Sequence, residues 1–384
     1  MAATRLVSSR VFAVAMLMWG LGVVAIIGFP LASVRLTHWA NGHMMEDRLL
    51  PAFAAEFNAA GYRTSTGAVV QVTPTLANSG EITGKLRTLL FHGPTSGEPR
   101  PDLVTPAADH WMDYLSYVLG RQVARPDVTK LIATTYLGIV TTRDMAHCLG
   151  WPQREVGFED VIRLAVAPHG WRSYPCARPE WGDEVLLAFT YPDRSSTARS
   201  LLYTFYAIAA HKPIEDLTTD DVHSPEVSEL IESFQRRLNC YLPDTLDLDL
   251  KMLPVPTCAQ FFFISEDNLV KLYQGKVAGK SLERDLVMIY PKEGAVVHNH
   301  SSFVPDVDWV SATQREAAGM WVDFLRSESQ QRVFMQDGFR RITDGPCIDP
   351  LGSPFSPCQS SPKRLIYPER IDPAVADEIL RTWR

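Results

Sequence analysis

One pattern occurs three times between residues 34 and 119, and it limits the fold more than any other feature of the sequence. A short apolar run that is typical of a strand leads into a small turn, and a segment with helical spacing of apolar residues follows. The strands are predicted at 34–39, 69–74 and 102–104, and the helices at 49–60, 78–90 and 109–119. This alternation predicts a parallel sheet with crossover helices, and therefore an α/β fold.

The turns after these strands are candidate ligand-binding segments, because ligands bind at the carboxyl ends of the strands in such sheets. The turns are small and polar, and they contain glycine. The candidate ligand-binding residues are Asn41, Gly42, Ser79, Gly80 and Thr105.

The stretch from Phe189 to Ala210 adds a second group of candidates. It begins as a short apolar strand, breaks at Pro192, and restarts as a helix that we expect to be buried on one face. The start of this helix contains three hydroxyl residues, Ser195, Ser196 and Thr197. Unpaired N–H groups and a partial positive charge at a helix start suit an oxyanion, a carboxylate or another acceptor-rich ligand. Plain N-capping by the hydroxyls is the alternative interpretation.

The remainder of the chain continues the mixture of strands and helices. Strands are predicted at 135–141, 261–264 and 286–290, and helices at 158–165, 225–238, 314–325 and 329–337. Residues 343–384 are rich in proline and serine. A segment of this composition is expected to lie along a surface as a tail instead of forming a core.

Composition limits the class of protein. The chain has 384 residues, of which 46 % are hydrophobic and 21 % charged, which is typical of a packed protein large enough for two domains. The net charge of −7 argues against general binding of nucleic acids, and there is no run of Lys or Arg that would reverse this expectation.

Residues 11–33 form an apolar run of 23 residues without a charge, long enough to cross a bilayer as a helix. Arg5 and Arg10 precede the run, so the positive-inside rule places the N-terminus in the cytoplasm and the chain after Val34 outside. A cleaved signal peptide is the alternative, but its apolar core is shorter and ends in a small-x-small site. LASVRL matches such a site poorly, so we predict a single-pass, membrane-anchored, extracytoplasmic protein.

The six cysteines form no CxxC pair and match no zinc-binding pattern, and an exported domain with an even number of them predicts disulfides. Six cysteines allow 15 connectivities, and buried free thiols are the alternative. Pairing between neighbours in the sequence would give Cys148–Cys176, Cys240–Cys258 and Cys347–Cys358.

Two sets of motifs stand out along the chain. The first set is Ser79-Gly80 ahead of a helix, RPDLVTP at 100–106 and HWMDYL at 110–115. The second set is MAHCLGWP at 145–152, TYPDRSSTARSLL at 190–202, IYPKEG at 289–294, and the spaced residues of 314–325 and 331–340. Together these motifs resemble the type II periplasmic, or extracellular, solute-binding proteins. The first set resembles the molybdate-binding branch, and the second set resembles the solute-binding proteins that occur with von Willebrand factor type A domains. The resemblance covers about residues 34–342.

The resemblance implies a two-lobed fold with a central, mostly parallel sheet in each lobe and a ligand in the cleft between the lobes. Residues 34–134 and 288–342 would form lobe 1, and residues 135–287 would form lobe 2. The anchor at 1–33 would precede the lobes and the tail at 343–384 would follow them. The chain would cross between the lobes near 133–136 and return near 287–290, and these two crossings would act as a hinge for closure around the ligand.

We therefore predict a non-catalytic solute-binding protein, without a cofactor or a metal ion, whose hydroxyls and helix starts capture a small anionic or acceptor-rich ligand. Its partners would be the ligand, the membrane, and either an ABC permease, for transport or signalling, or a von Willebrand factor type A protein.

Two other functions stay open. A membrane-anchored hydrolase would use one of the candidate serines and would need a histidine within hydrogen-bonding reach, although no GxSxG motif surrounds them. A structural or signalling module would retain only a vestigial cleft that side chains fill.

One group of possible metal ligands is set aside. His298 and His300 lie close to Asp306 and Asp308 in the sequence, but a zinc site needs three or four ligands in a fixed geometry. We therefore expect this segment to be an exposed polar loop.

Overall fold

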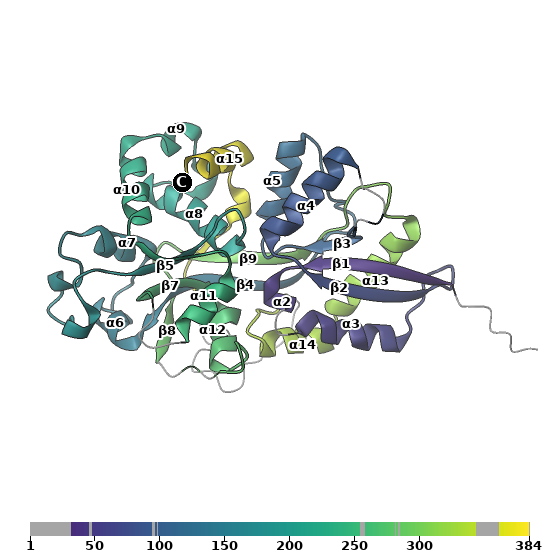
Figure 1. Ribbon diagram of the computed structural model, residues 1–384, viewed down its shortest axis with the longest axis horizontal. Helices are drawn as coiled ribbons and strands as arrows, with labels where there is room; N and C mark the ends of the chain where they lie inside the picture. Colours follow the sequence, from purple (N-terminus) through teal and green to yellow (C-terminus); the bar gives the residue numbers. More distant parts are fainter. Residues whose placement is uncertain are drawn as a thin grey trace, which may run out of the picture.

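Three parallel strands form the sheet of lobe 1, which lies at the right of the computed structural model in Figure 1. β1 (Ser33–Ala40) pairs with β2 (Val69–Leu76) on one side and with β3 (Leu103–Thr105) on the other. Ala40 pairs with Leu76 and with Thr105, so the three strands end at the same level. The structure describes residues 32–45, 48–93, 97, 99–253, 258–280, 282, 285–342 and 361–383.

Helices cover both faces of this sheet. Successive residues of a strand point to opposite faces, so β1 places Leu36 in the core on one face and Trp39 in the core on the other, and each core needs its own layer of helices. The helices of lobe 1 are α2 (Gly42–Met45), α3 (Leu49–Ala60), α4 (Ser79–His92), α5 (His110–Leu119), α13 (Ala312–Leu325) and α14 (Glu328–Gln336). On one face, α3 and α13 bury Phe53, Phe57 and Trp321. On the other face, α4 and α5 bury Ile82, Leu86 and Met112, together with their neighbours.

The second sheet is mixed, which corrects the expectation of a mostly parallel sheet in each lobe. Its strand order is β10-β9-β4-β7-β5-β6, and β8 also pairs with β4. β4 is antiparallel to β7, β8 and β9, whereas β5 is parallel to β6 and β7, and β9 to β10. The strands are β4 (Lys130–Thr142), β5 (Leu187–Thr190), β6 (Leu238–Leu242), β7 (Phe261–Ser265), β8 (Leu286–Ile289), β9 (Ala295–Ser302) and β10 (Leu365–Ile366).

β4 and β9 connect the two lobes, and they lie side by side across the middle of the molecule (Figure 1). Ile132 and Ala133 at the start of β4 belong to the core of lobe 1, whereas Leu137 and Ile139 belong to the core of lobe 2. β9 runs back antiparallel to β4, from Val296 in the core of lobe 2. The return to lobe 1 therefore follows β9 and comes later in the chain than the predicted 287–290.

The largest helix of lobe 2 is α8 (Ser196–Ala209), and Ile208 is its one residue that is not fully buried. This corrects the expectation of burial on one face. The other helices of lobe 2 are α6 (Arg143–Cys148), α7 (Phe158–Val166), α9 (Thr219–Val222), α10 (Pro225–Gln235), α11 (Thr245–Met252), α12 (Glu266–Tyr273) and α15 (Pro373–Thr382). Short 3₁₀ helices occur at Gly170–Ser173, Pro179–Trp181, Ile214–Asp216 and Pro368–Arg370.

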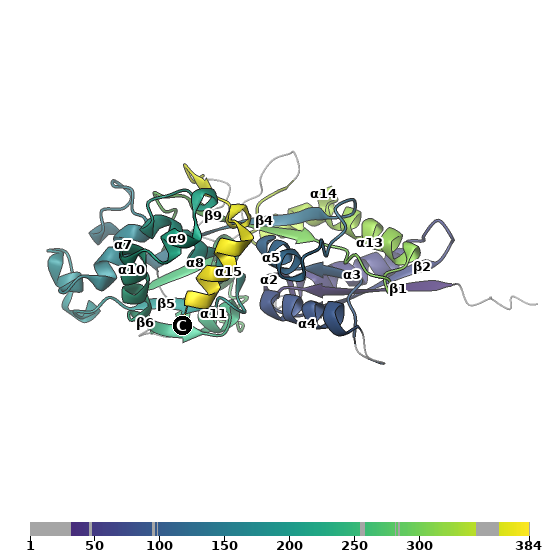
Figure 2. The ribbon, with the colours of Figure 1, turned by 90° about the horizontal axis from the view of Figure 1, so that it is seen from above.

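The C-terminal segment contributes to the core, which corrects the prediction of a tail without one. α15 buries Val375, Ala376 and Ile379, because its apolar residues recur at helical spacing after the N-cap Asp372. α15 packs against α8 and α9 of lobe 2 and also contacts α5 of lobe 1 (Figure 2). Tyr114 on α5 donates a hydrogen bond to Asp377 on α15 over 2.8 Å. The end of the chain therefore bridges the two lobes.

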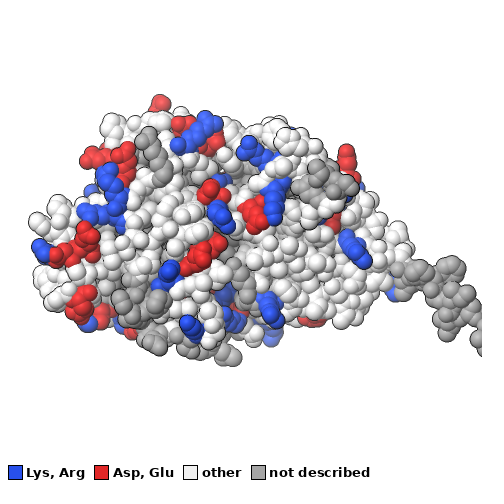
Figure 3. All heavy atoms as spheres, viewed as in Figure 1, with Lys and Arg blue, Asp and Glu red and all other residues white. Residues whose placement is uncertain are grey.

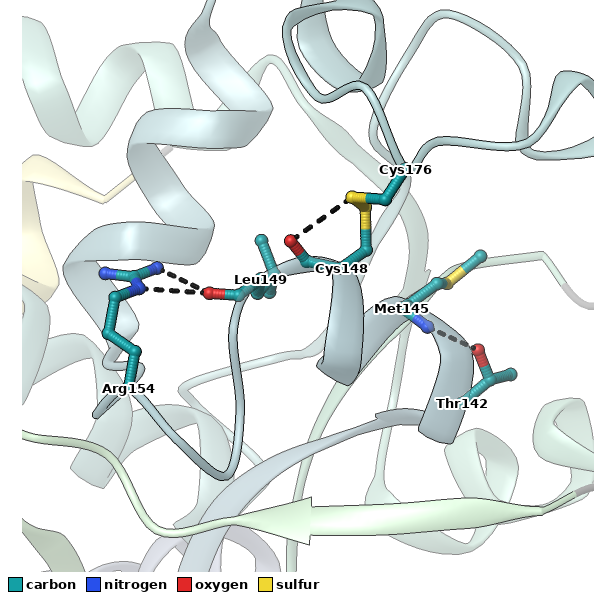
Figure 4. Close-up of a disulfide and its surroundings, with 6 residues drawn as sticks. All are labelled: Thr142, Met145, Cys148, Leu149, Arg154 and Cys176. Atoms are coloured by element: carbon teal, nitrogen blue, oxygen red, sulfur yellow. Dashed lines mark hydrogen bonds between the residues drawn. A yellow bond between two sulfur atoms is a disulfide. The ribbon is translucent and has the colours of Figure 1, made fainter.

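Two of the predicted disulfides are confirmed, and both lie in lobe 2. Cys148 at the end of α6 is bonded to Cys176, and Arg154 donates two hydrogen bonds to the carbonyl oxygen of the adjacent Leu149 (Figure 4). Cys240 in β6 is bonded to Cys258. The predicted pair Cys347–Cys358 lies outside the described residues and stays a prediction.

The predicted membrane anchor is also outside the described part of the chain, from residue 11 to residue 31. Within the described residues, no helix combines the length and the apolar character that a membrane span requires.

Candidate functional site

A cavity of about 480 Å³ opens between the two lobes where the strands of lobe 1 end. Lobe 1 lines it with residues 41–43, 76, 78, 79, 81 and 107, and lobe 2 with residues 194–196, 244–246, 249, 250, 268, 271 and 276–278. Of the eight residues predicted to bind ligand, Asn41, Gly42, Ser79, Ser195 and Ser196 line this cavity.

Asn41 is fixed at the end of β1 by the neighbouring strand. Its backbone N–H and its side-chain Nδ2 both donate to the carbonyl oxygen of Thr105, each over 3.0 Å. Nδ2 also lies 3.2 Å from Nδ1 of His300 on β9. Asn41 is 1 % exposed, and its Oδ1 has no hydrogen-bond partner within the described residues.

Ser79 enters the cavity because α4 begins there. Asn78 is the N-cap, and its side chain accepts a hydrogen bond from the backbone of Glu81 over 2.9 Å, which fixes the first turn. Ser79 is 3 % exposed, and its Oγ accepts a hydrogen bond from the backbone N–H of Ala107 over 3.0 Å.

The start of α8 supplies the facing hydroxyls from lobe 2. Ser195 is the N-cap: its Oγ accepts from the N–H of Ala198 over 3.5 Å and lies 3.3 Å from Oγ1 of Thr245. Ser196 Oγ accepts from the indole N–H of Trp111 over 2.7 Å and donates to Ser79 Oγ over 2.9 Å. Ser195 therefore performs the capping role that the sequence left open, whereas Ser196 contacts the opposite lobe.

Gly80, Thr105 and Thr197 do not line the cavity. The N–H of Gly80 donates to the carbonyl oxygen of Arg194 over 3.1 Å, and a Cβ at Gly80 would lie 2.1 Å from the carbonyl oxygen of Asp193. Thr105 is fully buried and holds Asn41 in place, and Thr197 is buried within α8.

Sequence reasoning missed the wall that α11 and α12 form. Asp249 on α11 accepts a hydrogen bond from Asn268 on α12, and Lys271 donates to the carbonyl oxygen of His43. Residues 266–273 directly follow β7, which runs parallel to β5, so the rule that ligands bind at strand ends applies to this segment as well.

The buried charges beside the cavity balance each other. Nδ1 of His43 lies 2.9 Å from Oδ2 of Asp267, and Nζ of Lys271 lies 3.4 Å from the same oxygen. Burial alone would raise the pKa of Asp267, but the charges of His43 and Lys271 and the hydrogen bonds from His43 and Ser265 hold that pKa far below its usual value. Asp267 is therefore ionised and compensates the charge of Lys271.

The segment of His298 and His300 is not the exposed loop that was expected. Both residues are fully buried in β9, and burial lowers the pKa of His298 to about 3 and holds the pKa of His300 well below its usual value. Asp306 and Asp308 lie beyond the end of the strand. No group of three or more His, Cys, Asp or Glu side chains in the described part of the chain is placed to hold a metal ion.

The candidate serines lack the arrangement that a hydrolase needs. Within the described residues, the hydrogen bonds of the Ser79, Ser195 and Ser196 hydroxyls involve no histidine side chain. Ser200 lies 2.9 Å from both His110 and His298, but it is fully buried in α8 and does not line the cavity.

The surface charge shows no binding face for a polyanion on the side seen in Figure 3. Lys and Arg side chains are interspersed there with Asp and Glu and form no broad patch of one sign.

The two lobes and the cleft between them define the fold of the periplasmic binding proteins. Solved structures with this fold include a periplasmic thiamin binding protein, which is 11 % identical over 92 % of this chain and 97 % of its own, with a TM-score of 0.59. Iron-bound HitA from Pseudomonas aeruginosa is 15 % identical over 91 % of this chain and 98 % of its own, with a TM-score of 0.58. AfuA from Actinobacillus pleuropneumoniae, with fructose-6-phosphate bound, is 14 % identical over 91 % and 97 %, with a TM-score of 0.57.

At these identities the similarity establishes the fold alone. No protein-family model matches the chain, and no curated protein matches it in sequence. The resemblance to the molybdate-binding branch and to proteins associated with von Willebrand factor type A domains stays a prediction.

Proposed function

We propose that this chain is a solute-binding protein that captures a small molecule between its two lobes without converting it. The observation that carries the proposal is the cavity of about 480 Å³, which both lobes line. This volume lies in the range of about 300–1,000 Å³ that is typical of small-molecule sites. A vestigial cleft would be filled by side chains, and a hydrolase would need a histidine beside a cavity-lining serine.

Asn41, Gly42, Ser79, Ser195 and Ser196 are the residues that we assign to the ligand. Gly80 shapes the site, because its missing Cβ lets the lobes approach each other. Thr105 and Thr197 shape it in a different way, by supporting the residues that line the cavity. The hydroxyls and the helix starts at α4 and α8 favour a ligand with hydrogen-bond acceptors.

The cellular setting is part of the same proposal. The two disulfides suit an oxidising, extracytoplasmic compartment. The apolar run at 11–33 would tether the protein to the membrane, with the N-terminus in the cytoplasm. A tethered binding protein would deliver its ligand to an ABC permease or report its occupancy to a signalling partner.

A thermal-shift screen of the full-length chain in detergent against a metabolite library tests the proposal. A ligand that binds the native state alone raises the free energy of unfolding by about 2.7 kcal/mol at a hundredfold excess over Kd. We expect compounds that stabilise the protein and bind with a stoichiometry of one ligand per chain by calorimetry. Their affinity should be lower in the double variant Ser79→Ala, Ser196→Ala. Turnover of ester substrates that is lost in the same variant would instead identify a hydrolase, and an absence of both would favour a vestigial cleft.

A further inference from the structure

The hydrogen bonds of Ser79 leave one hydrogen without an acceptor. The indole N–H of Trp111 can only donate, so Ser196 Oγ accepts from it and directs its own proton to Ser79 Oγ. The N–H of Ala107 donates to the same Ser79 oxygen. Both lone pairs of Ser79 Oγ are therefore occupied, and its own O–H is left to donate to a molecule in the cavity.

The hydrogen bonds of Asn41 leave an acceptor in the same way. The carbonyl oxygen of Thr105 cannot donate, so the atom that faces it must be the Nδ2 of Asn41. The second hydrogen of Nδ2 is directed to Nδ1 of His300, which is neutral because burial holds its pKa well below the usual value. Oδ1 of Asn41 is the remaining group, and it has no partner within the described residues.

The free O–H and the free oxygen belong to the same wall of the cavity. Asn41 is bonded to the carbonyl oxygen of Thr105, and Ser79 is bonded to the N–H of Ala107, two residues further along the chain. Asn41, Ser79 and Ala107 all line the cavity. Two residues of this wall therefore carry one unused donor and one unpartnered acceptor, and buried hydrogen bonds fix both side chains.

We propose that this wall, formed by Asn41 and Ser79, binds an organic solute through a group that carries both an N–H donor and an acceptor, such as a primary amide, a lactam or a cyclic imide. The N–H pairs with Asn41 Oδ1 and the acceptor pairs with Ser79 Oγ–H. The inference rests on the proposed solute-binding function and specifies the chemical class of the ligand.

The unpartnered acceptor of Asn41 disfavours an inorganic oxyanion as the ligand. A fully deprotonated oxyanion has only acceptors, so it would face Asn41 Oδ1 without a donor and leave that buried oxygen unsatisfied. Lys271 lines the cavity from α12 of lobe 2, and its charge is compensated by Asp267. A cavity of about 480 Å³ also leaves an oxyanion surrounded by unfilled space.

Isothermal titration of the full-length chain with paired probes tests the inference. The amide probes are benzamide, nicotinamide, 2-pyrrolidone and uracil at millimolar concentration. Each is compared with a counterpart that has no N–H: the N,N-dimethylamides of the first two, N-methyl-2-pyrrolidone and 1,3-dimethyluracil. The first two are also compared with their carboxylates. Sulfate, phosphate and molybdate are the acceptor-only probes. We expect at least one amide to bind about tenfold more tightly than its N-methylated counterpart, the value of one hydrogen bond to an otherwise unsatisfied oxygen.

Two variants assign the contacts. Asn41→Ala should abolish the difference between an amide and its methylated counterpart, and Ser79→Ala should weaken both by about tenfold. Thr88→Ala is the control, because Thr88 lies on α4 with its side chain bonded to Gly84 away from the cavity, and it should change neither affinity. The comparison of two probes on one protein keeps the test valid if a variant loses stability.

Three results overturn the inference. If an oxyanion or a carboxylate binds more tightly than every amide, the ligand class is wrong but the solute-binding function stands. If the methylated counterparts bind as tightly as the amides, Asn41 Oδ1 is not a contact. If no probe of any class binds, the inference fails, and the thermal-shift screen decides separately whether the proposed solute-binding function stands.

Discussion

The hydroxyl of Ser196 in lobe 2 donates a hydrogen bond to the hydroxyl of Ser79 in lobe 1 over 2.9 Å. Both residues stand at the first position of a helix, so two helix starts face each other across the cleft. The bond therefore joins the two lobes directly at the edge of the cavity.

The variants Ser195→Ala and Ser196→Ala should separate capping from interlobe contact. Ser195→Ala removes the cap of α8 and should lower the free energy of unfolding by about 0.5–2 kcal/mol in urea titrations. Ser196→Ala leaves the buried indole N–H of Trp111 without its acceptor, and a lost partner of this kind costs about 1–3 kcal/mol. Equal ligand affinity in both variants and in wild type would remove these serines from the proposed site.

Gly80→Ala should hold the lobes apart. The added Cβ would lie 2.1 Å from the backbone oxygen of Asp193, so the two segments must separate. We expect a larger radius of gyration by small-angle scattering and weaker ligand binding, with little loss of stability within lobe 1. Gly84→Ala is the matched control on α4, since no atom lies within 4 Å of its added Cβ, and an identical effect of both changes would refute this role for Gly80.

His38 should make the protein less stable in acid. Nδ1 of His38 accepts from the indole N–H of Trp321 over 3.2 Å, and Nε2 therefore carries the hydrogen directed to Thr105 Oγ1 over 2.8 Å. Burial lowers the pKa of His38 to about 3. Its neutral form thus stabilises the fold above the unfolded-state pKa of about 6.5, and this contribution is lost as the pH falls toward 3.

The change His38→Gln measures this contribution. Between pH 4 and 5.5, the free energy of unfolding of wild type should rise with pH more steeply than that of the variant, by about 1.4 kcal/mol per pH unit for one proton. Burial raises the pKa of Asp102 to about 6 and of Asp109 to about 7, and these carboxyls give a slope of opposite sign in both proteins. The exposed His92→Gln is the control, and parallel pH profiles for all three proteins would contradict the assignment.

Ile379→Ala should show that the end of the chain belongs to the core. Ile379 is fully buried in α15, so we expect a loss of about 2–5 kcal/mol in the free energy of unfolding. Arg381→Ala on the exposed side of the same helix should cost within about 0.5 kcal/mol. A small effect of both changes would restore the interpretation of a surface tail.

Removal of the Cys148–Cys176 disulfide by two serine substitutions should cost about 3–4 kcal/mol, because the bond closes a loop across a sequence separation of 28 residues. Urea titration measures this loss in the free energy of unfolding, with wild type under reducing conditions as the comparison.

Peptide mapping of the wild-type protein without reduction tests whether Cys347 and Cys358 form the third predicted pair.

The sequence predicted correctly those helices and strands in which apolar residues recur at regular spacing. The helix predicted at 49–60 has the observed bounds of α3, and the strand ends at Asn41 and Ser79 do meet at one cavity. These features follow from hydrophobic spacing and from the direction of parallel strands, which a sequence displays.

Features that depend on distant pairing could not be predicted in this way. The second half of β9 has a polar sequence, in which Asn299 separates two histidines. Pairing with β4 and contact with α8 bury these histidines, and neither can be predicted from the local sequence. Gly80 and Thr105 have the composition of ligand contacts, but tertiary packing gives them supporting roles. The composition of the C-terminal segment hid the short periodic stretch that forms α15.

The pairing of β4 with β9 places both crossings between the lobes in one two-stranded ribbon. Ser200 on α8 lies 2.9 Å from His298 in this ribbon, and Ser196, one helical turn earlier on α8, contacts Ser79 of lobe 1. We therefore expect a rotation of the lobes about the ribbon to break the Ser196–Ser79 bond first, because that bond joins the two lobes whereas Ser200 contacts the ribbon itself.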